Sequence, residues 1–266
     1  MDPVLVEMRA GYRVLTLNRP DRLNAVNIAL LEAMNAAVAD AAKDSSCRAL
    51  LLTGAGRAFC SGQDLNDRLP KPDMRVVVGE TLLSHYHPLI EKLRALPYPV
   101  VAAVNGVAAG AGCNLALAAD IVIAARSASF VQAFIRIGLI PDVGGTWILP
   151  RLVGMARARG LAMTGEPLDA AKAEQWGLIW KCVDDAALMK DAEALCAQFA
   201  KAPTVALGFM KRAFDASTRN DLQAQLALEH ELQREAGSTP DFLEGIRAFM
   251  EKRAPNFTGK KAGEKT

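Results

Sequence analysis

The sequence predicts an α/β protein, with one mixed core followed by a helical region. Short apolar runs alternate with segments of helical periodicity through the first half of the chain, and helical periodicity dominates after residue 150. Strands that alternate with helices are typical of parallel pairing through crossover connections. No internal repeat or low-complexity linker interrupts the 266 residues. We therefore expect a core over residues 1–200 and a C-terminal helical region over residues 201–266.

The first half begins with a predicted hairpin and a predicted helix. The stretch VLVEMRAGYRVLTL (4–17) alternates apolar and polar residues around Ala10-Gly11, which indicates two antiparallel strands. From Asn27 to Ala42, apolar residues recur at helical spacing. Uninterrupted apolar runs then indicate buried strands, and leucines three or four residues apart indicate a helix. In order, we expect a strand at 49–54, a loop at 55–65, a helix at 74–96, a strand at 99–104, a helix at 110–119 and a strand at 120–125.

The second half is predicted to be mostly helical. One apolar run, LIWKCV, indicates a short strand at 178–183. The tail GKKAGEKT is polar and basic, so we expect its end to be frayed. Helical periodicity predicts helices at 185–201, 203–216, 221–236 and 240–253.

Charge and hydropathy argue against two classes of partner. The chain has 31 basic and 29 acidic residues, a net charge of +2, which does not indicate a nucleic acid or an anionic membrane surface. Residues 95–119 carry no charge and are long enough to span a bilayer. That run, however, contains two prolines, three glycines and two asparagines. We therefore expect a strand, a glycine-rich turn and a short packed helix there, and no membrane span.

The cysteine and histidine content indicates a reduced protein without a metal site. The five cysteines form no CxxC pair, and the N-terminal segment MDPVLVEMRAGYR does not resemble a signal peptide. Free thiols in a cytoplasmic protein are therefore expected. The three histidines include no HExxH motif, so we expect no zinc site.

Three glycine-containing loops are candidates for chemistry. They are FCSGQDL (59–65), NGVAAGAGCN (105–114) and IGLIPDVGGTWILP (137–150), which contains the lone acid Asp142. Glycine-rich turns that lead into helices present backbone N–H groups to whatever lies above them. Such groups suit an anion, or a carbonyl oxygen that becomes negative during a reaction.

The residues alone leave simpler interpretations open. Gly110–Gly112 fits close helix–strand packing and matches neither GxGxxG, because residue 115 is leucine, nor a P-loop. Asp64 fits a turn residue that binds nearby amides, and a turn-forming role is also the favoured interpretation of Asp142. Cys60 and Cys113 have no histidine nearby in sequence and fit small buried residues.

Taken together, the loops resemble a known family. The segments AFCSGQDL, AVNGVAAGAGCNLALAADIVIA and FIRIGLIPDVGGTWILPRLVG occur in the order and spacing typical of the crotonase superfamily, also called the enoyl-CoA hydratase/isomerase family. The resemblance runs from LNRPDRLNAV (17–26) to APNFTGK (254–260). It implies a crotonase-like spiral of ββα units with a C-terminal helical trimerisation region. It also implies acyl-CoA thioester substrates, no cofactor beyond the CoA of the substrate, and a homotrimer or a dimer of trimers.

The resemblance also implies catalytic roles. The backbone amides of Ser61 and Ala111 match the oxyanion hole that polarises the thioester carbonyl. The two glutamates of the hydratases align with Asn114 and Phe134, which cannot transfer protons as carboxylates do. The single carboxylate of the isomerase branch matches Asp142. One carboxylate suffices for isomerisation, because a proton taken from one carbon can be returned at another.

Further matches concern the CoA moiety. Arg22, Leu23 and Ala25 match the loop that lines the adenine and pyrophosphate. Phe257 and Lys260 match positions that reach CoA phosphate from a neighbouring subunit, although Arg22 and Lys260 also fit solvated surface charges. Contacts to the bound acyl-CoA are expected from Gly62, Gln63, Asp64 and Gly110. The resemblance therefore predicts an acyl-CoA isomerase. The alternatives are a fatty-acid Δ3,Δ2-enoyl-CoA isomerase, an enoyl-CoA hydratase and a non-catalytic acyl-CoA-binding protein.

Overall fold

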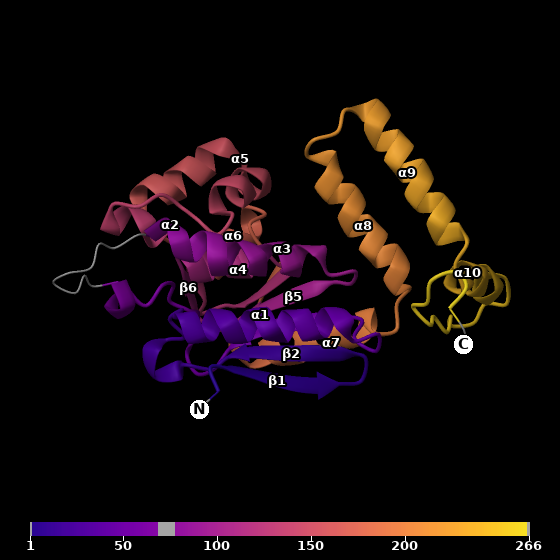
Figure 1. Ribbon diagram of the computed structural model, residues 1–266, viewed down its shortest axis with the longest axis horizontal. Coiled ribbons are helices and arrows are strands. Elements are labelled where there is room, and N and C mark those ends of the chain that lie inside the picture. Colours follow the sequence, from indigo (N-terminus) through magenta and orange to yellow (C-terminus); the bar gives the residue numbers. More distant parts are fainter. Residues whose placement is uncertain (1, 69–77, 265–266) are drawn as a thin grey trace.

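The strands of the computed structural model, which describes residues 2–68 and 78–264, form two sheets (Figure 1). The larger sheet has six strands, and only its first pair, the predicted hairpin, is antiparallel. In spatial order its strands are β1 (Val4–Arg9), β2 (Tyr12–Leu17), β3 (Leu50–Gly54), β5 (Val100–Val104), β7 (Ile121–Ala125) and β10 (Lys181–Val183).

The smaller sheet has four strands of three residues each: β4 (Ala58–Cys60), β6 (Val107–Ala109), β8 (Ser129–Val131) and β9 (Pro167–Asp169). Three of them follow a strand of the larger sheet directly, as β3–β4, β5–β6 and β7–β8. Helices α4 (Ala111–Leu117) and α5 (Gly145–Thr164) follow the second and third of these pairs. The ββα pattern that the family resemblance implies is therefore present.

Most of the predicted elements of the first half are confirmed, with two errors. Helix α1 (Ile28–Lys43) begins where expected, because the Asn27 side chain accepts a hydrogen bond from the Leu30 amide. The predicted helix at 74–96 consists of α2 (Val78–Thr81), the π-helical turn η3 (Leu82–Tyr86) and α3 (His87–Ala95), while its residues 74–77 lie outside the described part. The predicted loops at 55–65 and 105–114 are wrong in part, because they contain β4 and β6. Three residues are too few to show strand alternation.

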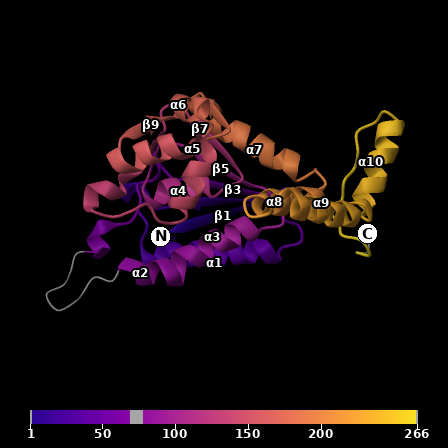
Figure 2. The ribbon, with the colours of Figure 1, turned by 90° about the horizontal axis from the view of Figure 1, so that it is seen from above.

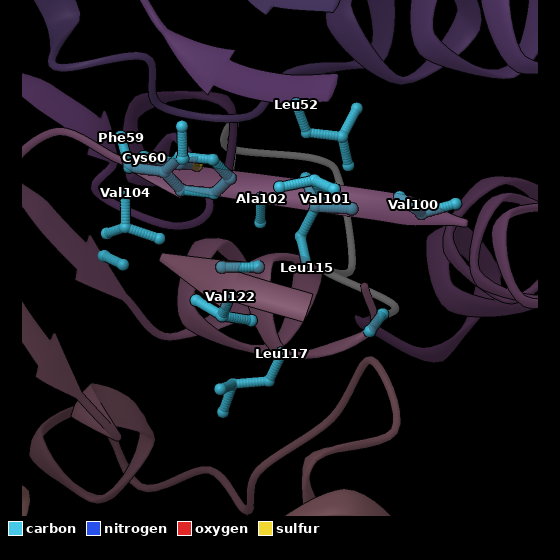
Figure 3. Close-up of a cluster of buried hydrophobic side chains, with 14 of the residues drawn as sticks. Leu52, Phe59, Cys60, Val100, Val101, Ala102, Val104, Leu115, Leu117 and Val122 are labelled. Carbon is cyan, nitrogen blue, oxygen red and sulfur yellow. The ribbon is translucent and has the colours of Figure 1, made fainter. Parts of the chain in front are cut away.

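The core lies between the two sheets and the helices that follow them. Every residue of β3, β4 and β5 is buried, including Phe59 and Leu52 (Figure 3). The one polar side chain of β3, Thr53, donates a hydrogen bond of 2.9 Å to the Ala103 carbonyl oxygen. Its burial therefore leaves no unpaired hydroxyl.

The predicted helices of the second half are also present, and the last three leave the core. After α6 (Ala170–Gln175), η5 (Asp185–Ala187) and α7 (Leu188–Phe199), the chain continues as α8 (Thr204–Ser217), α9 (Leu222–Gly237) and α10 (Pro240–Met250). Figures 1 and 2 show α8 and α9 side by side and directed away from the sheets, with α10 beyond them. No helix in the described ranges is both long and apolar enough to cross a bilayer. The uncharged run at 95–119 is instead mainly β5, β6 and α4.

Candidate active site

The three predicted loops meet at one cavity of about 340 Å³. Each loop follows a short strand of the smaller sheet or the helical turn η4 (Ala133–Ile137) that comes after β8. The cavity brings together six of the residues predicted for the acyl-CoA site: Ser61, Gly62, Gln63, Gly110, Ala111 and Asp142.

The rest of the cavity wall is largely apolar, and the sequence did not assign most of it. Tyr86 belonged to the apolar stripe of the predicted helix, and only its hydroxyl distinguished it from a core residue. That hydroxyl donates a hydrogen bond of 2.9 Å to Gln63 Oε1. The other lining residues are Leu65, Leu82, Ala133, Phe134, Arg136, Ile137 and Leu139.

The Ser61 amide does not fit the oxyanion role that the resemblance implies for it. The Ser61 amide donates a hydrogen bond of 3.0 Å to the Leu23 carbonyl oxygen and is therefore engaged within the chain. The Gly62 amide binds the Cys60 sulfur, and the Asp64 amide donates to the Val26 carbonyl oxygen at 2.8 Å.

The Gln63 amide replaces the Ser61 amide as the candidate for the first oxyanion-hole donor. Gln63 pairs with Val26 in a parallel bridge whose hydrogen bonds use the Gly62 carbonyl and the Asp64 amide. In such a bridge the N–H of the middle residue points away from the paired strand. A Cβ placed on Gly62 would lie 2.8 Å from Ala109 O and 3.7 Å from Ala111 N, so the second loop runs directly beside this segment. The Gln63 amide therefore points away from Val26, and the Ala111 loop lies beside the same segment.

The second amide, that of Ala111, is held by close packing of α4 on β4. Ala111 is the first residue of α4, so its amide has no acceptor within the helix. A Cβ on the next residue, Gly112, would lie only 2.4 Å from the Cys60 carbonyl oxygen. Glycine at 112 thus permits close packing, as the simpler interpretation proposed, and the same packing brings the two amide-bearing loops together.

Asp142 occupies a constrained turn at the cavity. Its side chain is half-buried, with Oδ1 fully buried. The next two residues, Val143 and Gly144, have φ angles of 51° and 82°. The left-handed region is costly for a β-branched valine, and such strain persists only where the surroundings hold it. The Gly145 amide helps to hold it, by donating to the Asp142 carbonyl oxygen at 2.8 Å.

The two positions of the hydratase glutamates carry no acid. Asn114 is fully buried, does not line the cavity, and donates from Nδ2 to the Asp142 carbonyl oxygen at 2.7 Å. Phe134 lines the cavity and lies 3.8 Å from a Cβ placed on Gly110. Within the cavity wall, Asp142 is the one carboxylate in the described residues.

Asp64 has a structural partner, as its simpler interpretation predicted. It is buried and accepts a hydrogen bond of 3.0 Å from Arg19, and its Oδ1 accepts from the side chain and amide of Asn66. Burial raises the pKa of Asp64, but the hydrogen bonds from Arg19 and Asn66 together lower it by more than burial raises it. The pKa of Asp64 therefore lies below the ordinary value. Asp64 does not line the cavity, and it stabilises the loop that carries Gln63.

The predicted CoA loop lies beside the cavity but does not line it. Arg22 is exposed, and its carbonyl oxygen accepts a hydrogen bond of 3.4 Å from the Ser61 hydroxyl. Leu23 has a φ of 49°, and its carbonyl oxygen accepts from Ser61. The buried Ala25 accepts from the Arg19 guanidinium at its carbonyl oxygen. The loop is thus fixed to the base of the site, and its contact with CoA remains a prediction.

Phe257 and Lys260 are not brought to this cavity within one chain. The Phe257 carbonyl oxygen accepts from Arg48 at 3.2 Å, and Asp241 accepts from the amides of Thr258 and Gly259. Lys260 lines a separate cavity. Their reach into a neighbouring subunit stays a prediction.

The cysteines near the site are inert. Cys60 and Cys113 are fully buried, and burial raises the pKa of each thiol to about 12. Neutral thiols of this kind are poor nucleophiles, which confirms the interpretation as small buried residues. In the described part of the chain, no three His, Cys, Asp or Glu residues are grouped so as to hold a metal ion.

Comparison with known proteins identifies relatives over nearly the whole chain. The sequence profile of the enoyl-CoA hydratase/isomerase family matches residues 7–260. The chain is 50% identical to the 1,2-epoxyphenylacetyl-CoA isomerase of Escherichia coli, over 98% of this chain and 100% of the relative. It is 51% identical to a protein of Rhodobacter capsulatus named "Probable enoyl-CoA hydratase", over 96% of this chain and 97% of the relative.

A solved structure has the same fold. The enoyl-CoA hydratase of Bacillus anthracis superposes with a TM-score of 0.91 at 33% identity, and the match covers 97% of this chain and 100% of that one. The predicted crotonase-like fold is thereby confirmed. The chain belongs to the enoyl-CoA hydratase/isomerase family.

Proposed function

We propose that the protein isomerises acyl-CoA thioesters, with Asp142 as the general acid/base and the amides of Gln63 and Ala111 as the oxyanion hole. One observation carries the proposal: Asp142 shares a cavity with both amide-bearing loops, while Asn114 and Phe134, which the resemblance aligns with the hydratase glutamates, are not acids. A site with one carboxylate can move a proton from carbon to carbon, but it lacks the second acid that the family's hydratases use to handle water.

The chemistry follows from these groups. Removal of a proton from the carbon next to the thioester places negative charge on the carbonyl oxygen, which the Gln63 and Ala111 amides stabilise. Each such donor is worth about 3–4 kcal/mol of barrier. For a 3-enoyl-CoA, Asp142 takes the proton at C2 and returns it at C4, which moves the double bond to the 2-position. The apolar ring of Phe134 forms part of the cavity wall and helps to exclude water. This route needs no cofactor beyond the CoA of the substrate.

For the acyl group, we propose ring-1,2-epoxyphenylacetyl-CoA, converted to oxepin-CoA. The E. coli relative that is 50% identical carries the name of this activity. The size of the cavity is compatible, because a cavity of about 150 Å³ holds a benzene ring and this one has about 340 Å³. Its largely apolar wall suits a six-membered carbon ring.

The second candidate is an enoyl-CoA hydratase, as the name of the R. capsulatus relative indicates. Purified protein is given 3-hexenoyl-CoA, crotonyl-CoA and enzymatically made 1,2-epoxyphenylacetyl-CoA in parallel. We expect isomerisation of 3-hexenoyl-CoA and the epoxide to be faster than hydration of crotonyl-CoA. The reverse order would replace the isomerase by a hydratase.

The role of Asp142 has its own test. Asp142→Asn keeps the shape of the side chain, so we expect thioester binding to persist while turnover and exchange of the substrate α-protons with deuterated water nearly vanish. The exposed Asp185→Asn is the matched control and should behave as wild type. A fully active Asp142→Asn would refute the assignment. Absence of α-proton exchange in the wild type would favour a non-catalytic acyl-CoA-binding protein.

The assembly and location that we propose are a homotrimer, or a dimer of trimers, in the cytoplasm. Large apolar side chains of the last three helices are exposed in the single chain, among them Phe214 (73%), Leu222 (75%) and Phe249 (82%). Exposed apolar surface of this kind is typical of subunit interfaces. Light scattering of wild type and Phe249→Glu tests the assembly, and a monomeric wild type would contradict it. The five free cysteines are consistent with a reducing compartment.

A further inference from the structure

Two buried amides connect the smaller sheet to the backbone of Asp142. Gln132, the residue after β8, donates from Nε2 to Asn114 Oδ1 at 2.8 Å. Asn114, on α4, donates in turn from Nδ2 to the Asp142 carbonyl oxygen at 2.7 Å. Both side chains are almost completely buried, with exposed fractions of 2% and 0%. Neither lines the cavity, so neither touches a substrate bound there.

The contact is closely fitted. A Cβ placed on Gly145 would lie 2.2 Å from Asn114 Nδ2, so the asparagine side chain fills the space beneath the Asp142 turn. The Asp142 carbonyl oxygen accepts both this bond and the one from the Gly145 amide. These two bonds fix the peptide from which the carboxylate projects, just before the left-handed Val143. Because the turn is strained, loss of one bond would let the peptide rotate and carry the carboxylate with it.

We propose that Asn114, supported by Gln132, is a positioning residue that fixes the direction of the Asp142 carboxylate toward the substrate. The proposal rests on the function proposed above, since it assigns Asn114 a role only through Asp142. It also gives a positive reason for an amide at this position. An asparagine here both accepts from Gln132 and donates to Asp142, whereas a carboxylate accepts only.

A pH-dependent variant separates this role from a merely structural one. In Asn114→Asp, the protonated carboxyl still donates an O–H to the Asp142 carbonyl oxygen, while the ionised form faces that oxygen with a second acceptor. Burial disfavours the ionised form and raises the pKa of a carboxyl by up to about 3–5 units, so the transition falls within an ordinary assay range.

The surroundings add few other titrating groups. Those near it in the described residues are the thiol of its neighbour Cys113, which accepts from Gln132 Nε2, the Cys60 thiol on β4, which lies against Gly112, and the carboxyl of Asp142, whose backbone carbonyl Asn114 binds. Burial raises the pKa of both thiols to about 12, so they stay neutral during the assay. Gln132, from the segment after β8, is neutral. A new pH transition in the variant therefore belongs to the introduced carboxyl.

The experiment measures kcat and KM for 3-hexenoyl-CoA against pH. In the wild type, Asp142 must be ionised to act as a base, so kcat rises with pH. For Asn114→Asp we expect near-normal kcat at low pH, then a fall of about tenfold per pH unit above the pKa of the introduced carboxyl, with KM nearly unchanged. For Asn114→Leu, which has no donor, we expect kcat about 100-fold below wild type at every pH, since small misplacements of a catalytic group have effects of this size.

Two further variants keep the test decisive. Gln132→Glu should show the same fall at high pH, because only its protonated form donates to Asn114 Oδ1, and it serves if Asn114→Asp does not fold. Asn105→Asp is the matched control, since Asn105 also donates to main-chain carbonyls, those of Gly54 and Gly56 at 2.8 and 2.9 Å, but lies outside the cavity. It should lower the melting temperature and leave the pH profile of kcat as in the wild type.

The outcomes are distinguishable. An active Asp142→Asn refutes the proposed function itself. If Asp142→Asn is inactive, then a wild-type pH profile in both Asn114→Asp and Gln132→Glu, or wild-type kcat in Asn114→Leu, refutes the positioning role alone.

Discussion

The two sheets of the core differ in length and in what they support. The long strands of the larger sheet, such as β3 and β5, are completely buried and five residues long. The strands of the smaller sheet have three residues each, and three of them lead directly into the segments that line the cavity. Long buried strands bury most of the apolar surface, while short strands mainly fix where a loop begins. We therefore expect changes at the larger sheet to affect stability, and changes at the smaller sheet to affect turnover.

After Asp142→Asn, the largest effect on turnover should come from Gly112→Ala. The added methyl group would lie 2.4 Å from the Cys60 carbonyl oxygen and must push α4 away from β4. Separation of the Ala111 and Gln63 amides should lower kcat by about 10²–10³-fold, the effect of losing one oxyanion donor. Steady-state kinetics with 3-hexenoyl-CoA checks this. Gly160→Ala, on a helix with open space around the position, is the matched control and should keep full activity. Wild-type kcat in Gly112→Ala would break the assignment of the two amides.

At the larger sheet, Leu52→Ala should destabilise the fold without changing the chemistry. Leu52 is 1% exposed, and removal of a buried leucine side chain typically lowers the free energy of unfolding by about 2–5 kcal/mol. Denaturant titration measures the loss, and kcat per folded molecule should equal that of wild type. Met8→Ala, on the exposed face of β1, should change stability by less than about 0.5 kcal/mol. A kcat defect in folded Leu52→Ala would show that the larger sheet also shapes the site.

The effect of pH on stability through Asp44, which pairs with Arg13 of β2, should be smaller. Hydrogen bonds from Ser46, and then from Arg13 of β2, lower the pKa of Asp44 from 3.8 to about 2. A carboxyl with a lowered folded-state pKa stabilises the protein above its unfolded-state pKa, and loses that contribution as the pH falls through its folded-state pKa. The stability difference between wild type and Asp44→Asn should therefore be largest above pH 3.8 and shrink toward pH 2. Urea titrations across that range measure it. If the stability difference between wild type and Asp44→Asn did not change with pH, Asp44 would not be the source of this pH dependence.

The smallest effect should come from Tyr86→Phe. This change removes the hydrogen bond to Gln63 Oε1 but keeps the ring in the cavity wall. The side chain of Gln63 stays anchored by its 2.9 Å bond to the Val26 carbonyl oxygen. We expect a loss in kcat of less than about tenfold, which corresponds to about 1 kcal/mol for one hydrogen bond. A loss as large as that of Gly112→Ala would mean that Tyr86 acts on the substrate directly.

The contrast between the sheets also explains what the sequence predicted. The larger sheet was predictable because its strands are apolar runs long enough to recognise. The strands of the smaller sheet are too short for any periodic signal, so β4 and β6 fell within predicted loops and β8 and β9 received no strand assignment. Only the family resemblance implied a second strand in each unit.

The site was predictable at the level of loops, and less so at the level of atoms. The acid at 142 and the amide at 111 were assigned to positions that the structure brings to the cavity. We place the other amide at Gln63, two residues after Ser61, because the Ser61 amide donates to the Leu23 carbonyl oxygen. Gly62, between the two, has a φ of 97°, and a motif does not carry the direction of each backbone N–H in such a loop. Likewise, the bond from Asn114 to Asp142 joins residues 28 positions apart and became visible only once the fold was known.

The close approach of Gly112 to β4 has a consequence for engineering. In the site that we propose, it places the charge-stabilising half in the main chain, where the identity of the side chains at 63 and 111 matters little. The proposed proton-handling half depends on the side chains at 114, 134 and 142. A new reaction on the same thioester can therefore be sought by varying those three positions while the amide scaffold is kept. By the same reasoning, these three positions discriminate between reactions among similar chains better than overall identity does.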